Sequence, residues 1–294
     1  GPGAPTPPIA LAGEGPARAR LDAVHVPVPD AVAERLAAIC AVSTADEVLD
    51  EASRDWWPQA MTWALDGQVP ARAALVASPG TAEEVAAVLA VCHEARIPVT
   101  AAAGRSGVCG ASVPLHGGVV LDLCGLSGIV DVDETSLVVD VRPGTFGDHL
   151  EHALRNEHRV TLGHWPQSVA LSTVGGWLAC RSAGQLSTRY GKIEDMVLGL
   201  DVALADGRTI TTGGAPRAAV GPDLTQLFVG SEGTLGIITG ARLRVHHAPT
   251  HEERAAYAFP SFADGLEAMR RLRQRGATPA VLRLYDPTEA DRSY

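Results

Sequence analysis

The sequence lacks the features that would place it in a membrane, in a disulfide-bonded framework or on nucleic acid. No uninterrupted apolar segment is long enough to span a bilayer. The five cysteines are scattered and odd in number, and no C-x-x-C pair occurs, which indicates neither a zinc site nor a disulfide framework. No run of lysine or arginine offsets the net charge of −10, so nucleic acid is not expected as a partner. With no secretory signal recognised either, we expect a cytoplasmic protein without a transmembrane segment.

The composition is that of an ordinary globular protein, with 46% hydrophobic and 20% charged residues in 294 positions. This length suits one large domain or two smaller ones. Residues 1–20 are rich in Pro, Gly and Ala and are expected to be disordered. Residues 21–73 are expected to form a helical segment, and residues 74–249 the main domain. Residues 250–294 would begin a second α+β unit whose partner strands are not in view.

The segment before the main domain contains a dense group of aromatic side chains. Trp56, Trp57 and Trp63 are three of the five tryptophans in the chain and fall within eight positions. We interpret the segment Arg54-Asp55-Trp56-Trp57-Pro58 as a packing plug against the main domain rather than as a site that stacks a ligand.

The main domain begins with a predicted β-α-β unit. Residues 74–77 have the pattern of a buried strand. Thr81 and Glu84 form the T-x-x-E capping box of the helix that follows. Residues 97–103 are the second predicted strand.

Later segments predict further strands and short helices. Ala205-Asp206-Gly207 predicts a tight hairpin turn, and Thr145 predicts the N-cap of a helix. After the main domain, we expect strands at residues 253–259 and 280–285 on either side of a helix at residues 262–275.

A glycine-rich loop follows the predicted strand at residues 97–103. Gly104, Gly107 and Gly110 recur at every third position, and Pro114 argues against a helix directly after them. A nicotinamide-binding Rossmann turn is therefore not expected, because that turn runs from G-x-G-x-x-G straight into a helix. Glycines allow positive φ and close approach, so the loop could turn its N–H groups toward a pyrophosphate. A glycine-rich surface loop without a ligand remains open on this stretch alone.

Three segments share small residues, hydroxyl groups and flexible backbone beside buried strands, namely residues 101–107, 167–173 and 232–238. Around them lie the specific runs Gly163-His164-x-Pro166-x-Ser168, Ser172-Thr173-Val174-Gly175-Gly176-Trp177, Tyr190-Gly191-x-Ile193-Glu194-Asp195, Gly221-Pro222-Asp223 and Gly230-Ser231-Glu232-Gly233-Thr234-Leu235-Gly236. In this order the segments resemble the FAD-binding domain of the vanillyl-alcohol oxidase and p-cresol methylhydroxylase superfamily. Within it they are most similar to the alkylglycerone-phosphate synthases (alkyldihydroxyacetonephosphate synthases), the flavoenzymes of ether-lipid synthesis. The resemblance covers residues 74–249 well and residues 257–294 more loosely.

The resemblance implies an α+β fold, with a two-subdomain FAD-binding domain of the p-cresol methylhydroxylase type over residues 74–249 and the start of a substrate (cap) domain after it. The FAD pyrophosphate would lie on residues 101–106, held by backbone donors, and residues 167–173 would line the flavin and ribityl chain. Residues 180–183 and 232–238 would contact the remaining flavin and adenosine surface. The implied cofactor-binding residues are Ala101, Ala102, Ala103, Gly104, Arg105, Ser106, Gly107, Gln167, Ser168, Val169, Ala170, Leu171, Ser172, Thr173, Gly176, Cys180, Arg181, Ser182, Ala183, Glu232, Gly233, Thr234, Leu235, Gly236, Ile237 and Ile238.

Some members of the superfamily carry a histidine in the first loop that bonds covalently to the flavin. The corresponding positions here are Arg105, Ser106 and Gly107, so the resemblance implies a noncovalent FAD, and no metal site is expected. Arg105 could pair with a phosphate or be solvated, and the sequence leaves both open.

Three other residues near these loops could contact the flavin but are interpreted as structural. We expect an ion pair for Arg181 and core packing for Trp177. His164 precedes Trp165-Pro166, and we interpret it as a structural residue of a turn.

The resemblance leaves three functions open, of which we favour the first. It is the redox-neutral exchange of the acyl group of an acyl-glycerone phosphate for a fatty alcohol. The second is an FAD-linked oxidase or dehydrogenase of a hydroxy acid or alcohol, which needs the same FAD cradle. The third is a flavin-binding fragment without activity, because the histidine cluster, tyrosine and phosphate-binding arginine of the synthases have no matching motif before Tyr294. A small-molecule or lipid substrate is expected, and a homodimer and peripheral membrane contact are compatible with these functions.

Overall fold

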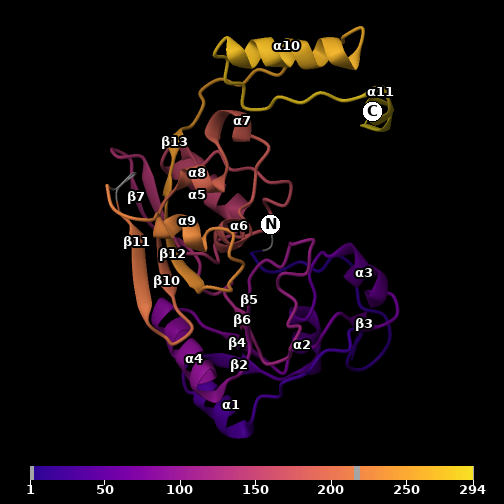
Figure 1. The fold of residues 1–294 in the computed structure, drawn as a ribbon, viewed down its shortest axis with the longest axis vertical. Coiled ribbons are helices and arrows are strands. Elements are labelled where there is room, and N and C mark those ends of the chain that lie inside the picture. Colours follow the sequence, from indigo (N-terminus) through magenta and orange to yellow (C-terminus); the bar gives the residue numbers. More distant parts are fainter. Residues whose placement is uncertain (1–2, 215–218, 294) are drawn as a thin grey trace.

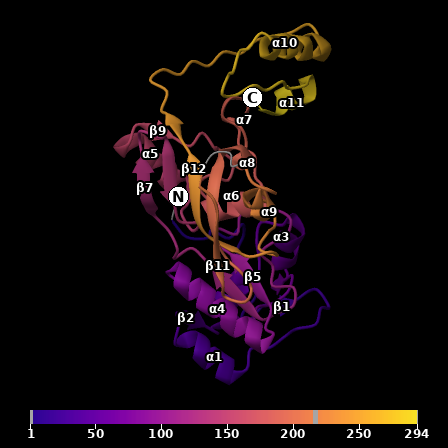
Figure 2. The same cartoon turned by 60° about the vertical axis from the view of Figure 1, so that its left-hand side comes forward.

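The computed structural model describes residues 3–214 and 219–293 and shows two sheets with their helices, joined into one body (Figure 1). A four-stranded sheet forms one half of the body and a five-stranded sheet forms the other. The helices α10 (Phe262–Gln274) and α11 (Pro287–Ser293) lie beyond the five-stranded half, at the top of both ribbon views (Figure 2). This mixed architecture confirms the predicted α+β class with two subdomains.

The four-stranded sheet contains the predicted β-α-β unit. Its strands lie in the order β2 (Ala41–Ser43), β4 (Leu75–Ser78), β6 (Val119–Asp122) and β5 (Val99–Ala102). The strands β4, β6 and β5 are parallel, and β2 is an antiparallel edge strand. Helix α4 (Ala82–Ala95) begins as predicted, because Glu84 N donates to Thr81 Oγ1 at 3.1 Å while Gly80 N donates to Glu84 Oε2 at 2.7 Å.

Helices α1 (Asp30–Ala37) and α4 cover this sheet and fill its core. Leu36 from α1 and Val88 from α4 are fully buried against strand residues such as Leu121. Helix α1 and strand β2 precede residue 74, where the main domain was predicted to begin, yet both pack into its first sheet. Composition did not reveal this, because the pairing of β2 with β4 is a long-range contact.

The five-stranded sheet is antiparallel throughout. Its strands lie in the order β11 (Thr209–Gly213), β10 (Val197–Ala203), β12 (Ile237–Arg244), β8 (Val138–Val141) and β7 (Ile129–Asp133). The hairpin of β10 and β11 confirms the turn predicted at residues 205–207. Helices α5 (Gly147–Glu157) and α6 (Val174–Cys180) place Leu154 and Trp177 in the core beside this sheet. Shorter elements connect these parts, namely β9 (Val160–Thr161), α7 (Ser187–Tyr190), α8 (Ile193–Met196), α9 (Leu224–Phe228) and β13 (His246–His247).

The prediction of Thr145 as the N-cap of α5 is wrong. Phe146 occupies the N-cap position, and no side chain caps the helix there. The Thr145 hydroxyl instead donates to the carbonyl of Arg142 at 2.7 Å and accepts from Gly128 N at 2.8 Å. A neighbouring turn therefore uses the hydroxyl that would have capped the helix.

The N-terminal segment differs from the disorder expected for residues 1–20, of which the structure describes residues 3–20. It contains β1 (Arg18–Ala19), which pairs with β3 (Gln68–Val69), and it contacts the helices α2 (Asp46–Ala52) and α3 (Pro58–Ala64). Ala17 N donates to Asp50 Oδ2 at 2.7 Å, and Trp56 Nε1 donates to the carbonyl of Thr6 at 2.9 Å. Side chains some 33 and 50 positions away thus hold backbone groups that have no secondary structure of their own. Composition alone could not reveal these contacts.

The tryptophan segment packs on itself and against the glycine-rich loop. The rings of Trp57 and Trp63 meet edge to face with centroids 5.3 Å apart. Trp57 also lies against Gly110 of the glycine-rich loop, where an added Cβ would be 3.4 Å from the indole.

The C-terminal segment contains the predicted helix but not the two predicted strands. Residues 253–259 and 280–285 have no strand pairing, and the helix α11 follows the second of them. A strand needs hydrogen bonds from a neighbouring strand, and within the described residues neither segment has one. The predicted cap-domain residue 294 lies outside the described part of the chain.

Candidate cofactor-binding site

The structure brings the three predicted loops together between the two sheets. A Cβ added to Gly104 would lie 2.3 Å from the carbonyl oxygen of Leu171, so the first loop touches the second through bare backbone. A Cβ on Gly233 would lie 3.5 Å from that of Ala101, which places the third loop beside the start of the first. Glu232 N also donates to the carbonyl of Ala179 at 3.0 Å, at the end of α6. The three loops are therefore neighbours in the folded protein.

The first loop, residues 101–107, spans the end of β5 and the start of the connection, residues 103–118, that joins β5 to the parallel strand β6. Of the two uses expected for glycine in this loop, positive φ and close approach, positive φ occurs at neither Gly104 nor Gly107, since the left-handed values fall on Arg105 at 51° and on Gly110 at 80°. Gly104 is required for close approach instead, whereas an added Cβ on Gly107 would meet only Asp55 Oδ2 at 3.8 Å. Ala102 is buried, and Ala103 and Ser106 are half-buried.

Arg105 is half-buried, which differs from a fully solvated loop arginine. Its Nη1 lies 4.0 Å from Asp122 Oδ2, at the limit of an ion pair. A guanidinium held this loosely could still bind an anionic group.

The second loop is a tight turn closed by its own hydroxyl groups. Ser172 N and Ser172 Oγ both donate to the carbonyl of Ser168 at 2.8 Å. Trp177 Nε1 donates to Ser172 Oγ at 2.7 Å, so this tryptophan belongs to the core, as interpreted from the sequence. Thr173 accepts from Gly176 N at 3.3 Å and starts helix α6. Gln167 is exposed, and Val169, Ala170 and Leu171 are half-buried, which leaves this loop accessible.

The end of α6 and the third loop complete the arrangement. Arg181 caps α6 in a left-handed conformation and pairs with Glu194 at 3.5 Å, which confirms the predicted ion pair. Cys180, Ala183 and Glu232 are exposed, as are Thr234 and Leu235. The remaining predicted residues of the third loop enter strand β12, where the side chains of Ile237 and Ile238 belong to the hydrophobic cores. Only the backbone of these two isoleucines could contact a cofactor, and Gly236 directly precedes them.

His164 is buried behind the second loop and has a structural role. Its Nε2 lies 2.8 Å from Ser182 Oγ, and its ring meets Trp177 edge on with centroids 4.8 Å apart. Burial lowers the pKa of His164 to about 4, so the imidazole is neutral at pH 7. The ring thereby positions Ser182, one of the predicted cofactor-binding residues.

Sequence reasoning missed one residue that faces this region. Asp55 follows helix α2, and its carboxylate points toward the first loop at Gly107. Its Oδ2 is buried and has no hydrogen-bond partner among the described residues. The acidic residue among tryptophans was visible in the sequence, but its burial beside a loop some fifty positions later was not.

A cavity of about 160 Å³ lies beside the first loop, lined by Glu51, Arg54, Asp55, Arg105 and residues 5–8. This volume accommodates one group of a dinucleotide rather than the whole molecule. A half-buried cation, an unpartnered carboxylate oxygen and the bare backbone at Gly104 suit a cofactor that carries both phosphate and hydroxyl groups. The residues present therefore fit FAD.

Neither a membrane-spanning helix nor a group of metal ligands occurs in the parts of the chain that the structure describes. No helix there is both long and apolar enough to cross a bilayer. No three His, Cys, Asp or Glu side chains in those parts are grouped so that they could hold a metal ion.

Residues 73–213 match the family described as FAD binding domain. Alkyldihydroxyacetonephosphate synthase of Dictyostelium discoideum is 34% identical over 231 residues, which cover 78% of this chain and 38% of that protein. Glycolate oxidase subunit GlcD of Bacillus subtilis is 32% identical over 212 residues, which cover 72% of this chain and 45% of that protein.

A solved structure of an alkyldihydroxyacetonephosphate synthase is 28% identical and matches with a TM-score of 0.82, covering 97% of this chain and 53% of that chain. The present chain thus spans about half of the relatives' length or less. The loops that converge here are the ones whose motifs resembled the vanillyl-alcohol oxidase and p-cresol methylhydroxylase superfamily. Residues 73–213 of this chain therefore belong to the FAD binding domain family, and FAD is the cofactor.

Proposed function

We propose that this chain is the flavin-binding part of an enzyme of the alkylglycerone-phosphate synthase type. The reaction would exchange the acyl group of an acyl-glycerone phosphate for a long-chain alcohol, release the fatty acid and leave the flavin without net reduction. The observation that carries this proposal is the extent of the structural similarity, which covers 97% of the chain and so reaches beyond the FAD-binding residues 73–213.

In this proposal bound FAD would supply a redox-active and electrophilic ring system. The backbone of residues 101–106 would hold the diphosphate, with Arg105 as the nearby cation. The contact of Gly104 with Leu171 would fix the spacing between the phosphate loop and the loop at residues 167–173. His164 would hold Ser182 in place, since the two side chains are 2.8 Å apart. Because Arg105 stands where some relatives of the superfamily carry a flavin-bonded histidine, FAD would be held without a covalent bond.

A second candidate is an FAD-linked oxidase or dehydrogenase of a hydroxy acid or alcohol. The similarity to a glycolate oxidase subunit, 32% identical over 212 residues, favours it. Both reactions need the same FAD-binding loops, so the residues that determine which reaction occurs must be those that contact the substrate. The lipid substrate, peripheral membrane contact, a homodimer, a cytoplasmic location and a role in ether-lipid biosynthesis all remain predictions.

The two reactions can be separated with the FAD-loaded protein under anaerobic conditions. One arm receives an acyl-glycerone phosphate with a radiolabelled long-chain alcohol, and the other receives glycolate or D-lactate. Stopped-flow absorbance follows the flavin, and chromatography follows the label. The synthase proposal predicts that label enters the product while the flavin stays oxidised. Stoichiometric bleaching by the hydroxy acid without label transfer would overturn it in favour of the second candidate. Binding of FAD with neither reaction would restrict these residues to flavin binding.

A further inference from the structure

Asp55 is a buried carboxylate of which only one oxygen accepts a hydrogen bond within the fold. The residue lies between α2 and α3 and is 2% exposed. Trp57 N donates to its Oδ1 at 3.0 Å, whereas its Oδ2 makes no hydrogen bond within the described chain, although the backbone of Gly110 lies near enough to the carboxylate to act against the rise of its pKa. An unpaired buried carboxylate oxygen lowers the stability of a fold, so one that is retained needs a reason beyond packing.

The unpaired oxygen faces the first loop, residues 101–107, where the cofactor is expected to bind. Oδ2 would lie 3.8 Å from a Cβ added to Gly107, and Asp55 lines the same cavity as Arg54 and Arg105. Arg54 is already occupied, because it pairs with Glu51 and donates to the carbonyl of Ile9 at 2.5 Å. Glu51 also lines the cavity, and its carboxylate is the one that Arg54 pairs with. The groups left for a ligand are therefore the unpaired oxygen of Asp55 and one cation, Arg105, whose partner carboxylate on Asp122 is 4.0 Å away.

We propose that Asp55 is a cofactor-binding residue whose Oδ2 accepts a hydrogen bond from a hydroxyl or N–H group of FAD bound at residues 101–107. FAD carries both kinds of donor, and its diphosphate is the anion that Arg105 suits. Burial raises the pKa of Asp55, and a donor from the ligand would compensate the carboxylate for the water it has lost. This assignment concerns cofactor binding alone and does not depend on which of the two reactions the enzyme performs.

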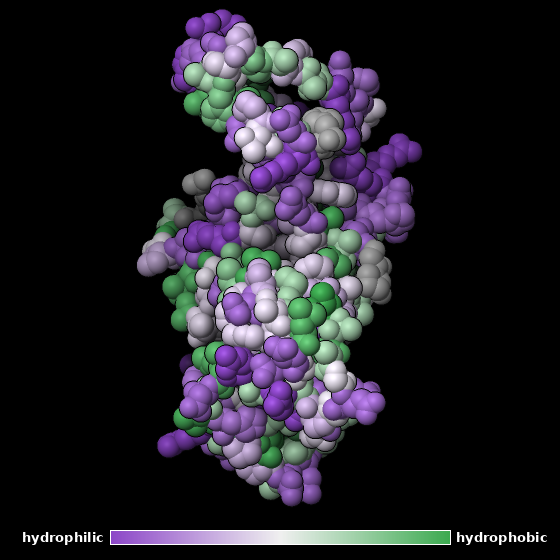
Figure 3. All heavy atoms as spheres, turned by 90° about the vertical axis from the view of Figure 1, so that its right-hand side faces the viewer, coloured by the Kyte–Doolittle hydropathy of each residue, from purple (hydrophilic) through white to green (hydrophobic). Residues whose placement is uncertain are grey.

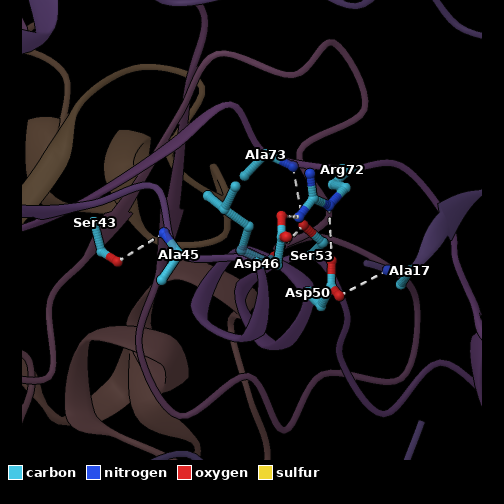
Figure 4. A network of polar contacts seen from close by, with 9 residues as sticks. Ala17, Ser43, Ala45, Asp46, Asp50, Ser53, Arg72 and Ala73 are labelled. Carbon is cyan, nitrogen blue, oxygen red and sulfur yellow. Dashed lines mark hydrogen bonds and ion pairs between the residues drawn. The ribbon is translucent and has the colours of Figure 1, made fainter. Parts of the chain in front are cut away.

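Asp50 provides a matched control on the preceding helix. Its Oδ2 accepts from Ala17 N at 2.7 Å and its Oδ1 accepts from Arg72 Nε at 2.7 Å, so both oxygens are bonded within the chain (Figure 4). Asp50 and Asp55 are both buried acidic residues five positions apart, but only Asp55 has an oxygen left for a ligand.

The experiment compares Asp55→Asn with Asp50→Asn in protein stripped of FAD. Thermal unfolding measures stability, and titration with FAD, followed by quenching of flavin fluorescence, measures Kd. Asp55→Asn keeps the Oδ1 acceptor for Trp57 N, so we expect an equal or higher Tm and a Kd raised by about tenfold. Asp50→Asn should lower the Tm by about 2–4 °C or more and leave Kd within about twofold of the wild type.

A second variant, Asp55→Ala, covers the case in which the Asn amide replaces the carboxylate as a partner of an FAD hydroxyl. We expect this variant to raise Kd by at least about tenfold in the folded protein. Wild-type Kd in both Asp55 variants would overturn the proposal. A lower Tm for Asp55→Asn together with wild-type Kd would assign Asp55 a purely structural role.

Discussion

Helices α5 and α10 have similar lengths and the same kind of apolar stripe, yet only α5 buries its stripe. Leu154 of α5 is 0% exposed and packs in the core of the five-stranded half. Leu266 of α10 is 55% exposed, and α10 buries only Gly265. Figure 3 shows green apolar atoms at the surface of the C-terminal segment, at the top of the molecule. An amphipathic pattern thus specifies which face of a helix is apolar, but it does not supply the surface that covers it.

The exposed helix α10 is held mainly by interactions close in sequence. Ser261 Oγ accepts from Asp264 N at 3.1 Å and caps the helix. Hydrogen bonds from Arg270 and Arg271 lower the pKa of Glu267 to about 2. Such local pairs form wherever the helix forms, which explains why this helix was predictable while the strands around it were not.

One substitution in each helix tests whether α5 and α10 differ in how much their apolar side chains contribute to stability. Leu154→Ala should reduce the free energy of unfolding by about 2–5 kcal/mol, because it removes a fully buried side chain. Leu266→Ala should change it by less than about 0.5 kcal/mol, because the side chain is already largely in water. Urea unfolding followed by circular dichroism measures both. Equal losses would show that α10 is covered in solution.

The comparison of a buried with an exposed residue extends to the pH dependence of stability, through His164 and His251. The folded pKa of His164 is about 4 against an ordinary 6.5, so the fold favours the neutral ring. Its contribution is present above about pH 6.5 and is lost as the pH falls toward about 4, a loss of about 3 kcal/mol. His164→Asn should flatten this part of the stability profile, measured by urea unfolding between these pH values. His251→Asn, which changes an exposed residue of the C-terminal segment, should leave the profile as it is. A wild-type slope in His164→Asn would show that other groups cause the acid sensitivity.

The features that the sequence predicted are local or come from the resemblance. The capping box of Thr81 and Glu84 and the hairpin at residues 205–207 depend on residues within a few positions of each other. The three loops were grouped by their motifs, and the fold brings them together.

The features that the sequence did not predict depend on distant partners. Thr145 was placed at a helix N-cap, but its hydroxyl bonds Gly128, seventeen positions earlier. The orphaned oxygen of Asp55 depends on how α2 and α3 pack beside the loop at residues 101–107. Periodicity and capping rules carry no information about such contacts.

The smallest expected change in stability comes from substitutions of Gly104 and Gly107, two glycines of the first loop that the sequence does not distinguish. Gly104→Ala would bring a Cβ to 2.3 Å from a backbone oxygen of Leu171, so one of the two loops must move. We expect a loss of about 1–3 kcal/mol in unfolding free energy and an FAD Kd raised by more than about tenfold. Gly107→Ala would meet only Asp55 Oδ2, at 3.8 Å, and its φ is not left-handed, so we expect the stability to change by less than about 0.5 kcal/mol. Urea unfolding and FAD titration of both variants measure the difference. Similar Kd values for the two variants would show that the contact between Gly104 and Leu171 does not set the geometry of the FAD site.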